Sequence, residues 1–388
     1  RDEDLPTAHA LHNDVFPPVP LEEMRRWMSR ADVTAGVAVR DGEVVGEIPL
    51  HVRRFVIRPG VTARLAFEHS VCVREDMRGQ GVGSAIQQEI RRFIASRADV
   101  LGVYRGAERS PAYNYYRDNG LADCCYVREW ILDDPARVAY DPPELSDASA
   151  VLDRAEQFAA VFDDAYAHAG GYEQRLPGFY ETAFTQLEAT ELRTRYHALV
   201  AEGAAGPRGH CILGLSPDGT LQIMELATRG RCPATADRLL REACAVAADA
   251  GGAVRAMLHD GGVYRPVFEA LGFIPQPRGE MIMADPLDPE RLANLTWAPQ
   301  AELADVLVRV WTPEEEAVVH RPGGEPTREM TLEMKHGEAV RWLMSRLDLR
   351  GAVRSETVTC RGVRPGDVEA LSRAIPFTPW EYQVIDHI

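Results

Sequence analysis

The stretch Phe67–Gln88, FEHSVCVREDMRGQGVGSAIQQ, decides the fold of this chain. Residues 67–73 are rich in apolar and β-branched side chains, which favours a β-strand. A glycine-rich turn follows at 78–83, and beyond it Ile86, Ile90 and Ile94 recur on one helical face. A strand that enters a glycine loop and leaves it as a helix predicts an anion site. Glycines let backbone N–H groups approach a phosphate, and the helix N-terminus adds partial positive charge.

The glycine loop departs from two common phosphate-binding patterns. It lacks the Lys-Ser/Thr pair of a nucleoside-triphosphate loop. It also lacks the third glycine of a dinucleotide loop, because Ser84 or Ala85 stands at that position. A hairpin-rich segment precedes it, whereas a dinucleotide loop opens a parallel βαβ unit. An ordinary glycine-rich strand-to-helix turn that binds nothing remains the alternative.

Composition and charge narrow the class of protein. The length of 388 residues suits two or three domains, and 45% hydrophobic with 26% charged residues is typical of a globular chain. No apolar run approaches the ~20 residues of a membrane span. The formal charge of −16 argues against binding nucleic acid through a broad basic face. It fits a cationic small substrate, or simply solubility.

Cysteine usage bears on the compartment and on metal binding. The seven cysteines are scattered and form no Cys-x-x-Cys pair. This pattern is typical of neither a disulfide framework nor a zinc site. We therefore expect a reducing, cytoplasmic compartment and no metal ion.

The first third of the chain predicts an ordered series of elements around the loop. Helices at 4–30, broken at Pro17-Pro18, precede strands at 33–39, 43–57 and 61–73, helix 84–97, strand 99–104, helix 111–119 and strand 123–132. Asp41-Gly42 is a hairpin signal between the first two strands.

Two motifs in this order resemble the GNAT superfamily of acyltransferases. Arg78–Gly83 matches Arg-x-x-Gly-x-Gly, the acyl-CoA pyrophosphate loop of that superfamily. Ala112–Leu121 resembles its Ala-x-x-Leu-Tyr-x-x-x-Gly-Phe segment, with Tyr115 at the Leu position, Tyr116 at the Tyr position and Leu121 at the Phe position. The resemblance implies that residues 1–134 form a catalytic GNAT domain.

The resemblance also assigns site residues, which we state as expectations. The family binds acetyl-CoA or another acyl-CoA as co-substrate, with the pyrophosphate at Arg78, Gly79, Gln80, Gly81, Val82, Gly83 and Ser84. A backbone N–H in Val71-Cys72-Val73 would polarise the thioester carbonyl, and Tyr116 would protonate the departing thiolate. The family transfers the acyl group directly, so the Cys72 side chain is expected to be incidental. A nucleophilic Cys72 is the alternative, but no His is paired with it in the local sequence.

Three groups are candidates for the general base. Glu68 and His69 are consecutive in the strand before the loop, so their side chains should point to opposite faces. The third candidate is the terminal carboxylate of Ile388.

A second round of elements follows a proline-containing linker at 133–145. Its order repeats that of the first domain, so 146–287 is predicted to be a second, degenerate GNAT copy. The glycine pattern is replaced by Thr228-Arg229-Gly230-Arg231-Cys232-Pro233, and Phe268 stands where the first copy has Tyr116. Proline removes an N–H and a phenyl ring cannot donate a proton, so this copy is expected to be structural.

The last part of the chain, 300–388, is predicted to be a small α/β domain. We expect strands at 304–311, 330–334 and 355–359 and helices at 338–347 and 365–374; Glu314–Glu316 is expected to be a solvated charge run, and 286–300 a join. The tail from Ile375 is apolar enough to dock into the fold. Two GNAT copies and a small third domain resemble the Eis-type (enhanced intracellular survival) acetyltransferases. Their third domain is sterol-carrier-like and their C-terminus reaches the first domain's active site.

The predicted fold class is therefore α/β (α+β), with two tandem GNAT-type folds and a small, sterol-carrier-like C-terminal domain. The predicted function is acyl-CoA-dependent N-acyl transfer, most simply of acetyl to a primary amine of a small or cationic molecule, by direct attack in a ternary complex. Two alternatives stay open: a non-catalytic acyl-CoA or metabolite sensor, and a GNAT-like transferase with an aminoacyl-tRNA donor. No membrane partner is expected, and a homo-oligomer remains open.

Overall fold

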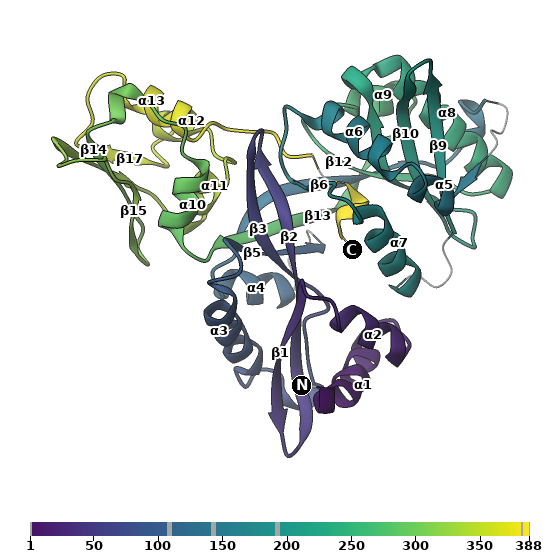
Figure 1. Ribbon diagram of the computed structural model, residues 1–388, viewed down its shortest axis with the longest axis horizontal. Helices are drawn as coiled ribbons and strands as arrows, with labels where there is room; N and C mark the ends of the chain where they lie inside the picture. Colours follow the sequence, from purple (N-terminus) through teal and green to yellow (C-terminus); the bar gives the residue numbers. More distant parts are fainter. Residues whose placement is uncertain (1, 107–110, 141–144, 191–194, 382, 388) are drawn as a thin grey trace. The chain divides into compact units, whose positions relative to one another are not determined.

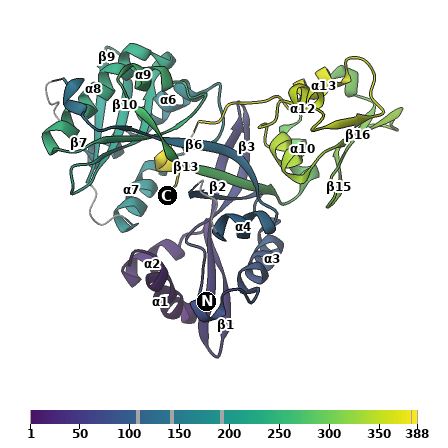
Figure 2. The same ribbon diagram turned by 180° about the vertical axis from the view of Figure 1, so that it is seen from behind.

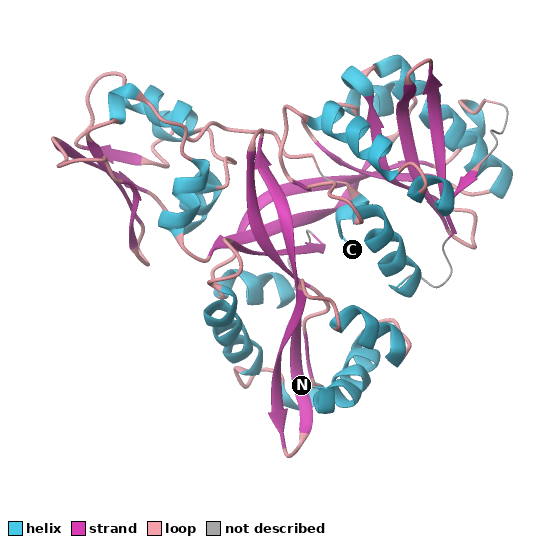
Figure 3. Cartoon of the chain, viewed as in Figure 1, coloured by secondary structure: helices cyan, strands magenta, loops and turns pink. Residues whose placement is uncertain are grey.

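A computed structural model describes residues 2–106, 111–140, 145–190, 195–381 and 383–387. The chain mixes helices and strands, as predicted (Figure 3), and it divides into two compact units. The first unit comprises residues 1–125 and 281–379, and the second comprises residues 126–280 and 380–388. Strands β6 (Ala122–Leu132) and β13 (Ile274–Pro286) each begin in one unit and end in the other. The division into three domains at 1–134, 146–287 and 300–388 stays a prediction.

The first unit begins with helices α1 (Leu5–Val15) and α2 (Leu21–Met28). The antiparallel strands β1 (Val33–Arg40) and β2 (Glu43–Arg58) follow and turn at Asp41 and Gly42, both with positive φ. The Asp-Gly pair suits this turn because its backbone twist matches that of the strands. Next come β3 (Val61–Glu68) and β4 (Cys72–Val73), the 3-10 turn η2 (Glu75–Met77), α3 (Val82–Ile94), β5 (Val100–Gly106) and α4 (Pro111–Asp118).

The single strand predicted at 61–73 is wrong in one respect: it is interrupted after Glu68. Ser70 has a φ of 43°, a left-handed conformation that bends the chain between β3 and β4. β3 pairs in parallel with β5 up to Glu68 opposite Val103. β4 pairs with β2, with Val73 opposite Gly46. The strand therefore diverges from β5 just before the glycine loop.

Helices cover both faces of this sheet. α3 places Ile86, Ile90 and Ile94 in one buried cluster with Ile48 and Leu50 of β2. On the other face, α1 packs Ala8 and Leu11 in a cluster with Val44 and Cys72. Figures 1 and 2 show α1 and α2 on one side of the β1–β2 hairpin, with α3 and α4 on the other. The sheet that leads into the glycine loop therefore has a helical layer on each face.

The C-terminal part of the first unit forms its own four-stranded sheet in the order β15-β14-β16-β17. Its elements are α10 (Pro289–Thr296), β14 (Val306–Trp311), β15 (Glu316–His320), β16 (Arg328–Glu333), α11 (His336–Leu343), α12 (Leu349–Arg354), β17 (Thr359–Arg361) and α13 (Asp367–Ala374).

Two expectations for this part are wrong. The join at 286–300 contains α10, whose start is fixed by the Asp288 side chain accepting the Arg291 N–H and by Pro289 in the first turn. The expected charge run at Glu314–Glu316 is confirmed as solvated, because all three side chains are exposed, although Glu316 already belongs to β15. The strand expected at 355–359 is largely a turn after α12, in which Glu356 has a φ of 60°.

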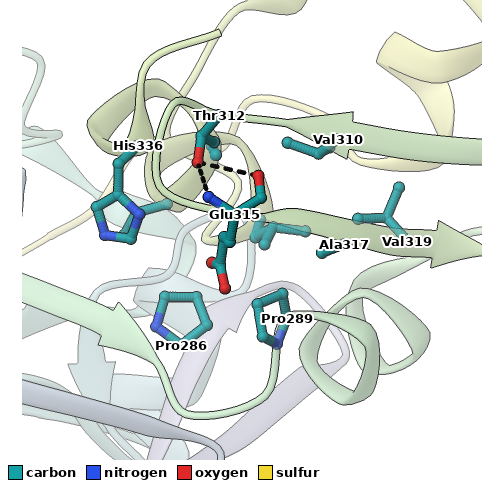
Figure 4. A pocket seen from close by; sticks show the side chains of 11 residues that line it. Pro286, Pro289, Val310, Thr312, Glu315, Ala317, Val319 and His336 are labelled. Carbon is teal, nitrogen blue, oxygen red and sulfur yellow. Dashed lines mark hydrogen bonds between the residues drawn. The ribbon is translucent and has the colours of Figure 1, made fainter. Parts of the chain in front are cut away.

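A small hollow lies in this C-terminal part, beside the end of β13 (Figure 4). It is lined mainly by proline, valine, alanine and leucine side chains, with Glu315 and His336 among them. The Thr312 hydroxyl accepts the Glu315 N–H at 3.1 Å and donates to the Glu315 carbonyl at 3.2 Å, which fixes the turn beside the hollow. The sterol-carrier-like character of this part stays a prediction.

The second unit repeats the element order of the first. Its elements are β7 (Ser146–Asp147), α5 (Ala148–Leu152), α6 (Ala155–Tyr166), β8 (Tyr172–Glu173), α7 (Phe179–Thr190), β9 (Arg195–Gly203), β10 (Gly206–Leu215), β11 (Leu221–Thr228), η4 (Arg229–Arg231), α8 (Pro233–Ala250), β12 (Val254–His259) and α9 (Arg265–Ala270). The β9–β10 hairpin corresponds to β1–β2. The series β11, α8, β12, α9 and β13 corresponds to β3–β4, α3, β5, α4 and β6.

The predicted docking of the tail is confirmed, within the second unit. Trp380 is fully buried, and Ile385 lies in a core cluster with residues of α6, α7, β10 and β11. The carboxylate of Asp386 pairs with the guanidinium of Arg175, and both side chains are completely buried. The same guanidinium pairs with Glu225 and lies over the rings of Phe162 and Phe179. These contacts anchor the 3-10 turn at Val384–His387.

Candidate active site

The glycine loop of the first unit presents its backbone to open space. Gly79 and Gly81 have φ values of 71° and 78°, which glycine adopts without strain. A Cβ atom at either position would meet nothing within 4 Å. Gly81 is the N-cap of α3 and offers no side chain to bond the first N–H groups of the helix. The N–H groups of the first turn, which includes Val82, Gly83 and Ser84, can therefore reach an anion.

Two side chains fix the shape of this loop. The Arg78 Nε atom donates to the Val73 carbonyl at 3.0 Å, and the Gln80 Nε2 atom donates to the Asp76 carbonyl at 2.7 Å. The first bond joins the loop to the end of β4, and the second joins it to η2. The two bonds support a loop whose glycines have no side chains to fix it.

The backbone of β4 directs an N–H group away from β2. The Arg74 N–H donates to the Val45 carbonyl at 2.9 Å, and the preceding residue, Val73, lies opposite Gly46. Opposed residues in an antiparallel pair alternate between bonded and non-bonded positions, so the Val73 N–H points away from β2. On that side the chain diverges from β5. The Val73 N–H, which belongs to the predicted stretch Val71–Val73, is therefore free of β2 and could donate to a carbonyl oxygen.

Cys72 points to the other side of β4, towards α1. Its thiol donates to the Glu47 Oε1 atom at a sulfur–oxygen distance of 3.6 Å. Burial, together with the Glu47 carboxylate, raises the pKa of this thiol well above its usual range. The thiol therefore keeps its proton at neutral pH, which disfavours a nucleophilic role.

Glu68 is 3% exposed and belongs to a chain of hydrogen bonds towards α3 and α4. The Gln87 amide donates to Glu68 Oε1, and the Tyr115 hydroxyl donates to Gln87 Oε1 at 3.0 Å. The Tyr115 hydroxyl also lies 3.1 Å from the Gly83 carbonyl. Burial raises the pKa of Glu68 to about 7, against the opposing effects of Gln87 and Arg91. A carboxyl group with such a pKa exchanges protons near neutral pH.

His69 faces the opposite side of the sheet, as the alternation along a strand predicts. Its ring contacts the Trp27 ring edge-on, with centroids 5.7 Å apart, and lies 6.2 Å from the ring of His51. The Nε2 atom of His51 donates to Asp32 at 2.9 Å, and its Nδ1 atom accepts from Arg53 Nε at 2.9 Å. Burial and then Arg53 lower the pKa of His51 to about 4, so this ring is neutral.

The sequence reasoning missed the polar group around His51 and the role of Gln87. His51 and Arg53 stand two residues apart in β2, so they share a face, but their burial depends on α2 and β3. The pair of basic residues two positions apart in β2 was the available signal.

Tyr116 lies in the buried cluster between α3 and the sheet and is 7% exposed. Its ring packs against that of Tyr115, with centroids 5.2 Å apart. Burial, followed by the charges of Glu68 and Tyr115, raises its pKa above the usual range. Tyr116 therefore holds its proton at neutral pH, and its raised pKa makes it a weaker acid than an exposed tyrosine. Its catalytic role stays a prediction.

The first unit brings together the loop, Val71–Val73, Glu68 and Tyr116, with His69 on the opposite face. Ile388, the third candidate base, lies outside the described residues.

In the second copy, side chains of the copy itself and of the tail accept the corresponding backbone donors, beside a small hollow lined by β11, β12, α9 and the tail. β11 pairs with β12 only at Leu221 and Gln222 and then diverges from it. The Thr228 N–H donates to the Tyr264 hydroxyl at 2.8 Å, and the Leu226 N–H donates to Gln383 Oε1 of the tail at 3.4 Å. Gln383 also donates to the Tyr166 hydroxyl at 2.9 Å.

Residues 4–121 match the acetyltransferase (GNAT) family. The first domain of the chain belongs to this family. GNAT enzymes transfer acyl groups and generally use acetyl-CoA, so the chain is an acyltransferase. No curated protein sequence matches the chain.

Solved structures share all or most of the fold of this chain at low sequence identity. A probable N-acyltransferase from Enterococcus faecalis V583 has a TM-score of 0.73 at 13% identity, covering 98% of this chain and 96% of its own. Eis1 from Mycobacterium abscessus has a TM-score of 0.62 at 13% identity, covering 98% and 97%. A tandem GNAT protein from the clavulanic acid biosynthesis pathway has a TM-score of 0.52 at 15% identity, covering 74% and 96%. These likenesses show a tandem GNAT fold of the Eis type.

Two further properties of this GNAT protein concern the described residues alone. None of the helices they form is long and apolar enough to cross a membrane. Among them, no group of three or more His, Cys, Asp or Glu side chains is arranged to hold a metal ion.

Proposed function

We propose that this GNAT protein transfers an acetyl group from acetyl-CoA to a primary amine of a small, cationic molecule. The observation that carries the proposal is the arrangement in the first unit of the open loop at Gly79–Gly81 and the outward N–H of Val73. The loop suits a pyrophosphate because its backbone donors lie at a helix N-terminus. The Val73 N–H suits the thioester oxygen because that oxygen gains negative charge during attack.

The proposed reaction is direct transfer in a ternary complex. The amine nitrogen attacks the thioester carbon, the C–S bond breaks, and the thiolate takes the Tyr116 proton. The proton that the nitrogen loses as the amide forms returns to the Tyr116 phenolate. The ammonium of the incoming substrate first gives its proton to a base. Tyr116 suits the acid role because it stays protonated until a thiolate forms beside it.

Glu68 is the favoured base among the three candidates. Burial raises its pKa to about 7, close to neutrality, and its negative charge raises the pKa of Tyr116. His69 packs against Trp27 on the other face of the sheet. The dependence of kcat on pH separates the candidates, since only loss of the true base should abolish its acidic limb. The variants to compare are Glu68→Gln, His69→Gln and a chain lacking Ile388.

A cationic acceptor is supported by charge. The formal charge of −16 attracts cations, and the buried Glu47 carboxylate lies opposite Cys72, one residue from Val73. Proposed partners are therefore small amines; nucleic acids and membranes are not proposed.

Steady-state kinetics with acetyl-CoA and an amine panel test the proposal. A ternary complex gives intersecting double-reciprocal lines, whereas parallel lines would indicate an acyl-enzyme and contradict direct transfer.

A further inference from the structure

Gln87 is a fully buried amide on the apolar face of α3. It is 0% exposed and lies between Ile86 and Ile90 on that face, whereas the next residue, Gln88, is exposed. Burying an amide is unfavourable unless its donors and acceptors are satisfied. The contacts of Gln87 therefore explain why a polar side chain occupies this position.

The orientation of the Gln87 amide follows from its partners. Its oxygen accepts the Tyr115 hydroxyl at 3.0 Å, so its NH₂ group points to Glu68. The Tyr115 hydroxyl has one proton and shares it with the Gly83 carbonyl at 3.1 Å. A Cβ at Gly83 would lie 3.0 Å from the Tyr115 ring, so glycine permits this close approach. The relay thus runs from the first turn of α3 to Glu68.

Glu68 has one hydrogen-bonded oxygen and one oxygen without a hydrogen bond from the described residues. Oε1 accepts from Gln87, while Oε2 is buried with no hydrogen-bond partner among the residues that the structure describes. Arg91 of α3 also acts on Glu68, but it is engaged with Asp285 at 2.5 Å and with the Asn119 carbonyl at 2.6 Å. The remaining titratable neighbours are Tyr115 and Tyr116 of α4.

We propose that Gln87 and Tyr115 are positioning residues that hold the Glu68 carboxyl group in one orientation, with Oε2 left to take the substrate proton. The inference rests on the proposed function, in which Glu68 is the base. Fixing Oε1 by a donor aligns the carboxyl group, and the donor also favours the charged form that accepts a proton.

The test compares Gln87→Leu with the matched control Gln88→Leu in the full chain. Losing the donor should raise the pKa of Glu68, because Gln87 lowers it at present. We expect the acidic limb of the kcat profile to move up by about one to two pH units in Gln87→Leu. Gln88→Leu should match the unaltered protein, and Tyr115→Phe should give a smaller shift. CoA affinity should stay unchanged in Gln87→Leu and in Gln88→Leu.

A double variant separates positioning from packing. Glu68→Gln with Gln87→Glu exchanges the amide and the carboxyl group but keeps a hydrogen bond between them. We expect it to restore thermal stability relative to Gln87→Leu without restoring turnover. Recovered turnover, or an unmoved acidic limb in Gln87→Leu, would overturn the inference.

A titration independent of turnover distinguishes this inference from the proposed function. ¹³C NMR of the Glu68 carboxyl carbon should show a higher midpoint in Gln87→Leu than in Gln88→Leu. An unchanged midpoint refutes the relay even if the enzyme is active. A shifted midpoint in a protein that acetylates no amine refutes the proposed function and supports the relay's action on Glu68.

Discussion

The hydroxyl of Tyr264 accepts the N–H of Thr228 at 2.8 Å. Thr228 ends its strand in the second copy as Val73 ends β4 in the first copy, where the Val73 N–H points away from β2. The side-chain oxygen of Gln383 in the tail accepts the N–H of Leu226, two residues earlier in β11, at 3.4 Å. Pro233 also begins α8, which removes an N–H from the helix start. The second copy thus satisfies internally the groups that a thioester would need.

One acyl-CoA should therefore bind per chain. Isothermal titration with CoA checks this through its stoichiometry. Two sites of comparable affinity would contradict a structural second copy, as would protection of Arg229–Arg231 by CoA in hydrogen exchange.

Replacing Gly81 by valine should abolish CoA binding. Its φ of 78° is unfavourable for a β-branched residue, and the side chain would stand in the open space before α3. Gly60→Val is the matched control, because Gly60 has a φ of 74°, open surroundings and a place in the β2–β3 turn. Calorimetry should find CoA affinity lost in the first variant and kept in the second. Equal affinities would show that the loop does not hold the pyrophosphate.

Tyr116→Phe should lower kcat by roughly 10²–10⁴-fold, the usual effect of losing a positioned proton donor. CoA affinity should barely change, since the ring and its packing remain. Tyr113→Phe serves as the control, because Tyr113 lies on the same helix as Tyr116. The Tyr113 hydroxyl donates to Asp123 at 2.9 Å, and we assign it no role in the reaction. Full activity in Tyr116→Phe would refute the acid assignment.

His336 should stabilise the first unit in a pH-dependent way. Its imidazole donates to the Gly120 carbonyl at 2.8 Å and lies 3.1 Å from Asp285, and the bond to Asp285 raises its pKa from 6.5 to about 9. A raised folded-state pKa gives stability that is complete below the unfolded pKa of 6.5 and is lost as pH rises through 9. Urea unfolding should show a deficit in His336→Gln at about pH 6 that vanishes near pH 10. A deficit independent of pH would contradict the ion pair.

The sequence predicts the site to the extent that its residues lie close together along the chain. Arg78–Gly83 and Ala112–Leu121 carry their patterns within short windows, so the loop and Tyr116 could be located. The bend at Ser70 could not, because no glycine or proline marks it and the apolar residues around it read as one strand. The anchoring of the tail was also hidden, since Arg175 and Asp386 are 211 residues apart.

Burial was the other property that the sequence could not supply. Gln87 and Gln88 are chemically identical neighbours, and only the packing of α3 on β3 decides which of them contacts Glu68. The strand expected at 355–359 failed for a related reason. Three of its five residues are β-branched, which favours a strand, but bonds from Ser355 and Thr357 to the Ala352 carbonyl fix a turn after α12 instead.

The most direct test of the central claim is mass-spectrometric detection of acetyl transfer by the full chain. The protein is incubated with acetyl-CoA and a panel of polyamines, aminoglycosides and lysine-containing peptides, and free CoA is measured in parallel. We predict an acetylated primary amine formed in equal amount with CoA, and no product from the Gly81→Val variant. Binding of acetyl-CoA without acetylation of any amine on the panel would contradict the claim and indicate a CoA sensor.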